Sequence, residues 1–233
     1  FAIQYSQEAR MYVMLVFLIT IAAYFFMRAL KTDQIGYFIL WGIFTGLACL
    51  THYMGLIFSV IYLPVFVAWK IIDGKIYEKK IGWQMVKDFL PSKKLLAGYG
   101  AAFLTFSPWL TTFWYHLTHM GNNLSWIVPA SFGDIFWNIQ MFIFGTPKGE
   151  MSAGMPNPNE FYGVANNTAV TVLVIFLVGI TIFLFKKRKD KEKISAVLIL
   201  SAGFLFVVYA LSLFGENYFV ARYLMPAAYF TFV

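Results

Sequence analysis

The chain is organised as long runs of apolar and aromatic residues, separated by short segments that hold almost all of its charge. A run of about 20 apolar residues matches the hydrocarbon thickness of a bilayer, and in lipid only helices and closed barrels satisfy every backbone polar group. The pattern therefore predicts an all-α, polytopic membrane helical bundle with six complete spans and a truncated seventh. The predicted spans are residues 11–30, 36–50, 54–71, 95–115, 164–185, 194–214 and, incomplete, 222–233.

The composition argues against other classes of protein. Hydrophobic residues make up 60% of the chain and charged residues only 12%, whereas a soluble domain carries about a quarter charged residues. The net charge of +7 would suit nucleic acid, but the basic residues lie in the connections between apolar runs, so we expect no nucleic-acid partner. The single cysteine, Cys49, allows no internal disulfide and no thiolate metal cluster.

The basic residues also predict an orientation. Nearly all Lys and Arg residues lie on alternate connections, within residues 28–31, 70–94 and 186–193. By the positive-inside rule this predicts cytoplasmic loops at 31–35, 72–94 and 186–193. The exceptions, Arg10, Lys148 and Arg222, fall on the other side. We therefore expect a multi-pass protein with Phe1 on the outer side. A prokaryotic inner membrane is the expected location, and a eukaryotic endoplasmic reticulum is the alternative.

The longest predicted external segment is the loop at residues 116–163. In its middle, Asp134 and Asn138 share one helical face, and apolar residues cover the remainder. Gly145 and Pro147 would end such a helix. The pattern predicts an interfacial helix at residues 134–144, resting on the outer leaflet.

Polar residues with useful chemistry gather at the predicted outer mouths of the spans. At the first span, Glu8 and Tyr12 share a helical face, and Arg10 lies close to the membrane surface. At the last span, Arg222 and Tyr223 hold the corresponding position. Each guanidinium suits bidentate binding of a lipid-linked phosphate, and equally suits snorkelling to lipid headgroups.

A third group lies in the short polar break between the second and third predicted spans, where His52 and Tyr53 occur. The break predicts a tight helical hairpin. An imidazole at this position can donate a hydrogen bond to a phosphate or a sugar hydroxyl. The alternative is a histidine that is satisfied by a neighbouring helix carbonyl or by water.

Four sequence motifs resemble family 39-type glycosyltransferases, the multi-spanning enzymes related to protein O-mannosyltransferases and to the lipid A aminoarabinose transferase. Residues 6–12 (SQEARMY) resemble the S-x-E-A-R-x-Y signature, and residues 46–53 (GLACLTHY) resemble a G-L-A-x-L-T-H/K-Y turn. Residues 107–110 (SPWL), followed by Trp126, resemble the P-W-L-P … W segment, although Thr111 replaces the final proline. Residues 221–226 (ARYLMP) resemble an R-Y-L-x-P motif.

This resemblance implies a GT-C fold and transfer of a sugar from a polyprenyl-phosphate or dolichyl-phosphate donor on the non-cytoplasmic face. The acceptor would be a protein, a glycan or a lipid. The family's general base lies in the first external loop, which would precede Phe1, so the chain is expected to be an internal fragment that is inactive alone. The residues expected to bind the donor are Glu8, Arg10, Tyr12, His52, Tyr53, Arg222 and Tyr223.

Two other functions remain open from the sequence: a membrane transporter or flippase, and a non-catalytic scaffold of the cell envelope. No cofactor is expected, although a divalent metal is not excluded. His116 and His119 are three residues apart, a spacing that allows one shared metal, but no acidic residue follows until Asp134. We interpret this pair, together with Trp109 and its neighbouring tryptophans, as membrane-interface residues.

Overall fold

The computed structural model of the protein describes residues 11–73, 92–119, 191–214, 224 and 226. Every regular element in these ranges is helical, which confirms the predicted all-α class for this part of the chain. The elements are α2 (Met11–Thr32), α3 (Ile35–Thr51), α4 (Met54–Asp73), α6 (Lys93–Phe106), η2 (Ser107–Trp109), α7 (Leu110–His119), α11 (Lys191–Leu198), η3 (Ile199–Gly203) and α12 (Phe204–Phe214).

Three of the described helical runs are long and apolar enough to cross a membrane. They are Met11–Thr32, Met54–Ile72 and Lys191–Leu213, and Ile35–Thr51 is a shorter apolar helix. The outer surface of the bundle is also apolar: Leu104 and Phe206 are 70% and 72% exposed, which suits lipid as the surrounding solvent. The predicted interfacial helix at 134–144, the predicted span at 164–185 and, apart from residues 224 and 226, the span from 222 lie outside the described residues.

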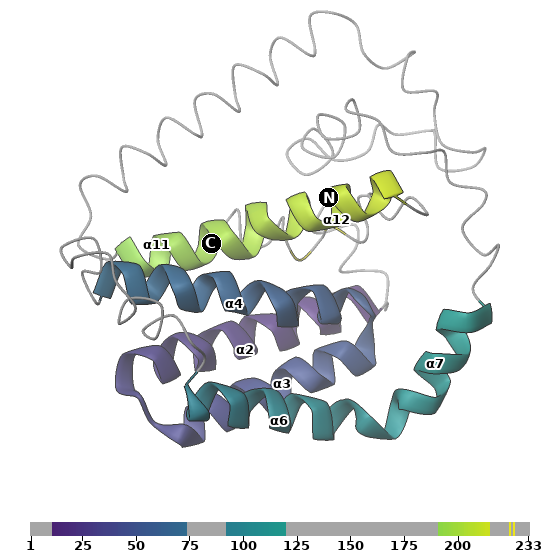
Figure 1. Ribbon diagram of the computed structural model, residues 1–233, viewed down its shortest axis with the longest axis horizontal. Helices are drawn as coiled ribbons and strands as arrows, with labels where there is room; N and C mark the ends of the chain where they lie inside the picture. The colour runs from purple at the N-terminus through teal and green to yellow at the C-terminus, as the bar shows by residue number, and fades with distance from the viewer. Residues whose placement is uncertain (1–10, 74–91, 120–190, 215–223, 225, 227–233) are drawn as a thin grey trace, which may run out of the picture.

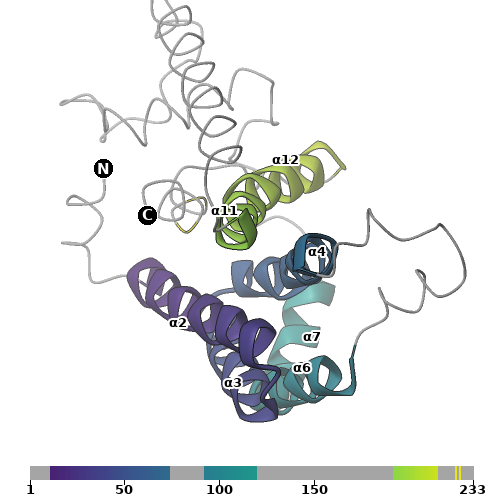
Figure 2. The same ribbon diagram turned by 90° about the vertical axis from the view of Figure 1, so that its left-hand side faces the viewer.

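The helices pack side by side, but not in chain order. α2, α3 and α4 form consecutive hairpins, α6 lies against α3, and α11 and α12 lie along α4 (Figures 1 and 2). In the turn after α2, Asp33 has a φ of 52°, a left-handed conformation that Asp tolerates better than most residues. Lys94 Nζ donates to the Asp33 carbonyl at 2.7 Å and to its carboxylate at 2.5 Å, so the start of α6 is tied to this turn.

Aromatic side chains fill the centre of the bundle. The ring of Trp41 on α3 is fully buried and contacts Phe26 of α2, Tyr62 of α4 and Tyr99 of α6 at centroid distances of 4.8, 5.3 and 4.9 Å. One side chain therefore contacts α2, α4 and α6. Phe204 of α12 stacks on Phe58 of α4 at 4.3 Å, and this contact holds the last helix to the bundle.

Small residues allow α3 and α6 to approach closely. A Cβ atom on Gly42 would overlap the carbonyl oxygen of Gly98, and one on Gly46 would lie 2.6 Å from Thr105 Cβ. Gly42 and Gly46 are four residues apart, the small-xxx-small spacing that recurs where membrane helices meet. The spacing was visible in the sequence, but our sequence prediction did not include it.

The fourth predicted span is not one straight helix. Residues 95–115 were expected to form a single span, but α6 ends at Phe106 and a short 3₁₀ segment, η2, leads into α7. Pro108 lies in that segment and supplies no backbone N–H, which is why the α-helical hydrogen-bond ladder is interrupted there. Beyond this bend α7 turns away from α6, and none of its residues is buried (Figure 1).

Candidate functional site

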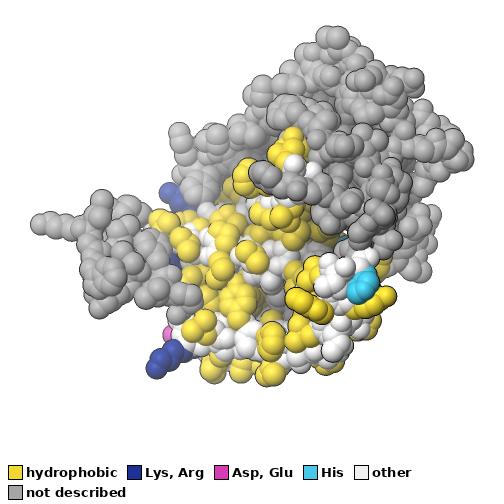
Figure 3. Space-filling view, turned by 45° about the vertical axis from the view of Figure 1, so that its right-hand side comes forward, with side chains coloured by type: hydrophobic (Ala, Val, Ile, Leu, Met, Phe, Trp, Pro, Cys, Tyr) yellow, Lys and Arg dark blue, Asp and Glu magenta, His cyan; other side chains and the backbone are white. Residues whose placement is uncertain are grey.

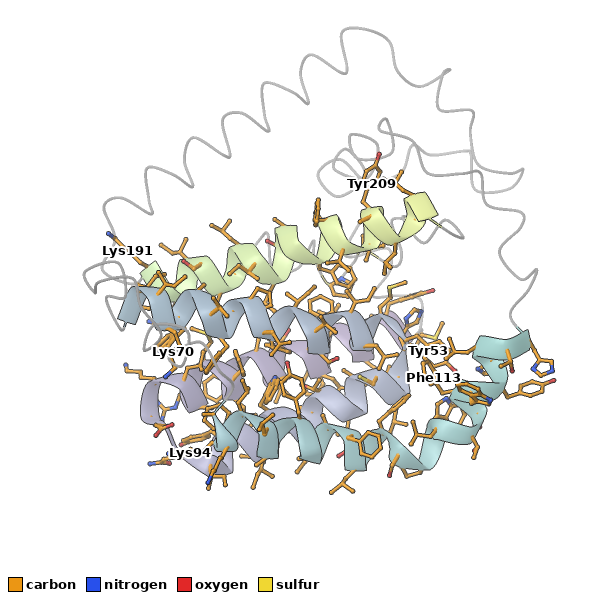
Figure 4. All side chains as sticks on the ribbon, in the orientation of Figure 1. Tyr53, Lys70, Lys94, Phe113, Lys191 and Tyr209 are labelled. Atoms are coloured by element: carbon orange, nitrogen blue, oxygen red, sulfur yellow. The ribbon has the colours of Figure 1, made fainter. Side chains whose placement is uncertain are left out.

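The two ends of the bundle differ in charge. All described Lys and Arg residues lie at one end of the bundle, where helices α2 and α4 end and helices α6 and α11 begin. They are Arg28, Lys31, Lys70, Lys93, Lys94, Lys191 and Lys193. Figure 4 shows Lys70, Lys94 and Lys191 at that end, with Tyr53 and Phe113 at the other. In Figure 3 basic side chains lie at one edge of a hydrophobic face and a histidine at the opposite edge. Within the described residues, the second end contains no Lys, Arg, Asp or Glu.

His52 forms the turn between α3 and α4 at the uncharged end. Its backbone N–H donates to Ala48 O at 3.0 Å, which closes α3. Its Nδ1 accepts a hydrogen bond from the Met54 backbone N–H at 3.1 Å, which satisfies one of the donors that a helix start leaves open. The imidazole is therefore part of the structure of the turn, as the alternative interpretation of the sequence held.

The same bond fixes the chemistry of the His52 ring. Because Nδ1 accepts from Met54, the proton of the neutral ring must lie on Nε2. Burial lowers the pKa of His52 to about 4, so the ring is neutral at pH 7. His52 thus combines two roles: Nδ1 caps α4, and Nε2–H is an uncharged donor.

Tyr12 and His52 are brought together from different elements. Tyr12 lies in the first turn of α2, its side chain is buried, and its ring centroid is 5.4 Å from that of His52. The sequence proposed both residues separately, and the fold makes them neighbours. The other proposed site residues, Glu8, Arg10, Arg222 and Tyr223, lie outside the described residues.

Tyr53 has its partners on η2 and α7. Its hydroxyl is 2.5 Å from His116 Nδ1 and 3.4 Å from Trp109 Nε1, and its ring meets Phe113 edge-on at 5.4 Å. An indole N–H can only donate, so the Tyr53 hydroxyl accepts from Trp109. The tautomer of His116 decides whether the Tyr53 hydroxyl donates to Nδ1 or accepts from it. From the sequence, Trp109 and His116 were interpreted as interface residues, and neither contact with Tyr53 was predicted.

His116 and His119 have different partners. His116 Nδ1 faces Tyr53, whereas His119 Nδ1 lies 3.0 Å from the carbonyl oxygen of Tyr115, whose ring stacks on that of His119 at 4.3 Å. No group of three or more His, Cys, Asp or Glu residues that could hold a metal ion occurs in the described part of the chain. The pair therefore gives no geometric support for the shared metal that its spacing allows.

Comparison of the chain with protein-family models, with curated proteins and with solved structures gave no match.

Proposed function

We propose that the protein transfers a sugar from a polyprenyl-phosphate donor to an acceptor on the non-cytoplasmic side of a prokaryotic inner membrane. It does so as a multi-pass protein, with the spans and orientation that the sequence predicts. The proposal rests on the four sequence motifs that resemble family 39-type glycosyltransferases. The all-helical architecture does not support the proposal by itself, because many unrelated membrane proteins share it.

One structural observation supports the proposal: the difference in charge between the two ends of the bundle. Lys and Arg residues favour the cytoplasmic side of a membrane, so the end with Lys70, Lys94 and Lys191 is the inner one. Tyr12, His52 and Tyr53 then lie at the outer end, where a lipid-linked sugar donor would be used. Tyr12 comes from one motif region, and His52 and Tyr53 come from a second that lies far from it in the sequence.

In this proposal Arg10 and Arg222 bind the phosphate of the donor, and His52 Nε2–H is a supporting donor. Breaking the bond between sugar and phosphate leaves negative charge on the phosphate oxygens. Fixed donors that match this charge stabilise the transition state more than the substrate, which is what accelerates the reaction. Arginine suits this role because its planar group offers two parallel hydrogen bonds. Glu8, Tyr12 and Tyr223 are proposed to contact the donor as well.

The test exchanges each arginine for lysine in the natural full-length protein. Arg10→Lys and Arg222→Lys keep the positive charge but lose bidentate geometry, so each should lower transfer roughly 10²-fold. Arg10→Ala should be only slightly worse than Arg10→Lys. The assay follows consumption of radiolabelled undecaprenyl-phosphate hexoses by membranes with matched amounts of each variant.

Snorkelling to lipid headgroups predicts the opposite result, because lysine replaces arginine freely in that role. Full transfer by both lysine variants would therefore remove these arginines from the site. Movement of a labelled polyprenyl-phosphate sugar between leaflets, without transfer by the wild type, would reject the enzyme in favour of a flippase.

A further inference from the structure

One side chain outside α7 meets three residues along a single face of the α7 region. Trp109, Phe113 and His116 are four and three residues apart, which places them on one helical stripe. All three contact Tyr53, two through hydrogen bonds to its hydroxyl and one through ring packing. The hydroxyl of Tyr53 thus makes two hydrogen bonds to this stripe, one from Trp109 and one with His116.

The rest of α7 is weakly attached. None of its residues is buried, and Trp114 and Leu117 are 68% and 55% exposed. Across the bend, Phe113 also meets Phe106 of α6 edge-on at 5.6 Å. A 3₁₀ segment containing a proline connects α7 to α6, and such a segment fixes the direction of the following helix less firmly than a continuous α-helix. Among the described residues, the contacts that set the orientation of α7 are those with Tyr53 and the packing of Phe113 on Phe106.

Tyr53 also belongs to the turn that carries His52. The Tyr53 carbonyl oxygen accepts from Leu56 N–H at 3.0 Å, and the preceding residue caps α4 through Nδ1. A displacement of the Tyr53 side chain is therefore expected to displace the backbone of His52, the adjacent residue. The orientation of α7 and the position of the His52 ring are linked through two adjacent residues.

We propose that Tyr53 and His116 form a latch, which holds α7 against the α3–α4 turn and makes His116 a positioning residue for His52. In this view the Tyr53 hydroxyl serves α7 rather than the substrate. The consequence for sugar transfer rests on the proposed function, whereas the latch itself does not. Opening the latch frees α7 to rotate about η2 and leaves the turn without its partner.

The first experiment measures the latch without any assay of transfer. Spin labels replace Leu104 on α6 and Leu117 on α7, both exposed and on opposite sides of the bend, with Cys49 changed to alanine. Double electron–electron resonance in lipid nanodiscs then gives the distance distribution across η2. We expect one narrow distance in the otherwise wild-type protein, and a broader distribution in Tyr53→Phe, which keeps the ring but loses the hydroxyl.

Two substitutions at His116 test the bond atom by atom. His116→Asn places an amide oxygen close to the former position of Nδ1, so it should retain the narrow distance. His116→Gln places its amide nearer to the position of Nε2 and should broaden the distribution as Tyr53→Phe does. Loss of one such hydrogen bond should change the ratio of latched to open protein about two- to tenfold. Tyr115→Phe is the control, because it removes a hydroxyl from α7 away from the latch.

The second experiment measures transfer in the same variants. We expect kcat to fall by a similar factor in Tyr53→Phe, in His116→Gln and in the double variant, with KM nearly unchanged, because all three open one latch. His116→Asn should keep the kcat of the wild type, because it keeps the hydrogen bond to Tyr53. An unchanged distance distribution in both Tyr53→Phe and His116→Gln would overturn the latch, and a broadened one with wild-type kcat would overturn the positioning role. A wild type that consumes no donor would reject the proposed function, while the distances would still decide the latch.

Discussion

At the scale of single residues, the two ring nitrogens of His52 have different roles, so two substitutions can test the capping of α4 and the donation to substrate separately. In His52→Asn the side-chain oxygen lies near the former position of Nδ1 and can still cap α4, whereas the Nε2–H donor is lost. In His52→Gln the amide reaches toward the former position of Nε2, and the cap is lost. We therefore expect His52→Asn to retain thermal stability and lose transfer. His52→Gln should lose about 1 kcal/mol of stability, the usual cost of a missing cap, and retain part of the transfer activity.

The control for this prediction is the dependence of stability on pH. Burial lowers the pKa of His52 from its ordinary value of 6.5 to about 4. Between these values the unfolded chain holds the proton and the folded chain does not, so stability is present above pH 6.5 and falls as the pH drops towards 4. Thermal unfolding in detergent at pH 7 and pH 5 should show a smaller loss in His52→Asn than in the wild type. Equal losses would mean that His52 is not the group responsible.

The sequence revealed part of this site and not the rest, for a physical reason. Tyr12, His52 and Tyr53 could be selected because apolar runs end beside them, and the end of a span is a local property. The bond between Tyr53 and His116 joins residues 63 positions apart and depends on the angle of the bend at Pro108. No local pattern encodes that angle, so His116 seemed to be an ordinary interface residue.

At the scale of helices, the close contact between α3 and α6 gives a prediction with an internal control. Gly42→Ala would drive a Cβ into the backbone carbonyl of Gly98, and backbone cannot move aside as a flexible side chain can. The helices must separate, which should cost about 1–3 kcal/mol. Gly100 is on α6 with nothing within 4 Å, so Gly100→Ala should leave stability unchanged or raise it slightly, because Ala favours helix.

Thermal unfolding of the two variants in the same detergent provides the measurement. If the melting temperature were equally low in both variants, the loss of stability would come from adding a methyl group at any glycine, not from the contact between α3 and α6. A melting temperature of Gly42→Ala equal to the wild type would show that α3 and α6 do not meet as closely as described.

The helices also show what periodic hydrophobicity can predict. The expected span at 11–30 corresponds to α2 at Met11–Thr32, and the span at 54–71 to α4 at Met54–Asp73, because the apolar runs end where charged residues begin. The run at 95–115 is equally apolar, yet the helix bends within it. Hydropathy reports the environment of a segment but not the path of its backbone, and Pro108 alone did not distinguish an interrupted helix from a kinked one.

At the scale of the whole molecule, the separation of charge between the two ends determines how the bundle should sit in a bilayer. On the face that Figure 3 shows, many apolar side chains lie between the ends. Placing the charged end outside would put the Lys and Arg residues on the wrong side for insertion. Several helices contribute to this separation of charge, since α2, α4, α6 and α11 each place basic residues at the same end. The orientation is thus a joint property of several helices, and no single substitution should reverse it.

We predict that His116 and its neighbours face the outside and that Lys193 faces the cytoplasm. Thr118 and Lys193 are both exposed and lie near opposite ends of the bundle, so they form a matched pair for cysteine labelling in a protein whose Cys49 is replaced by alanine. A membrane-impermeant maleimide applied to intact cells should label Thr118→Cys, and Lys193→Cys should react only after lysis. If Lys193→Cys reacted in intact cells while Thr118→Cys was protected, the orientation would be reversed. Tyr12, His52 and Tyr53 would then lie on the cytoplasmic side, where an external sugar transfer cannot use them.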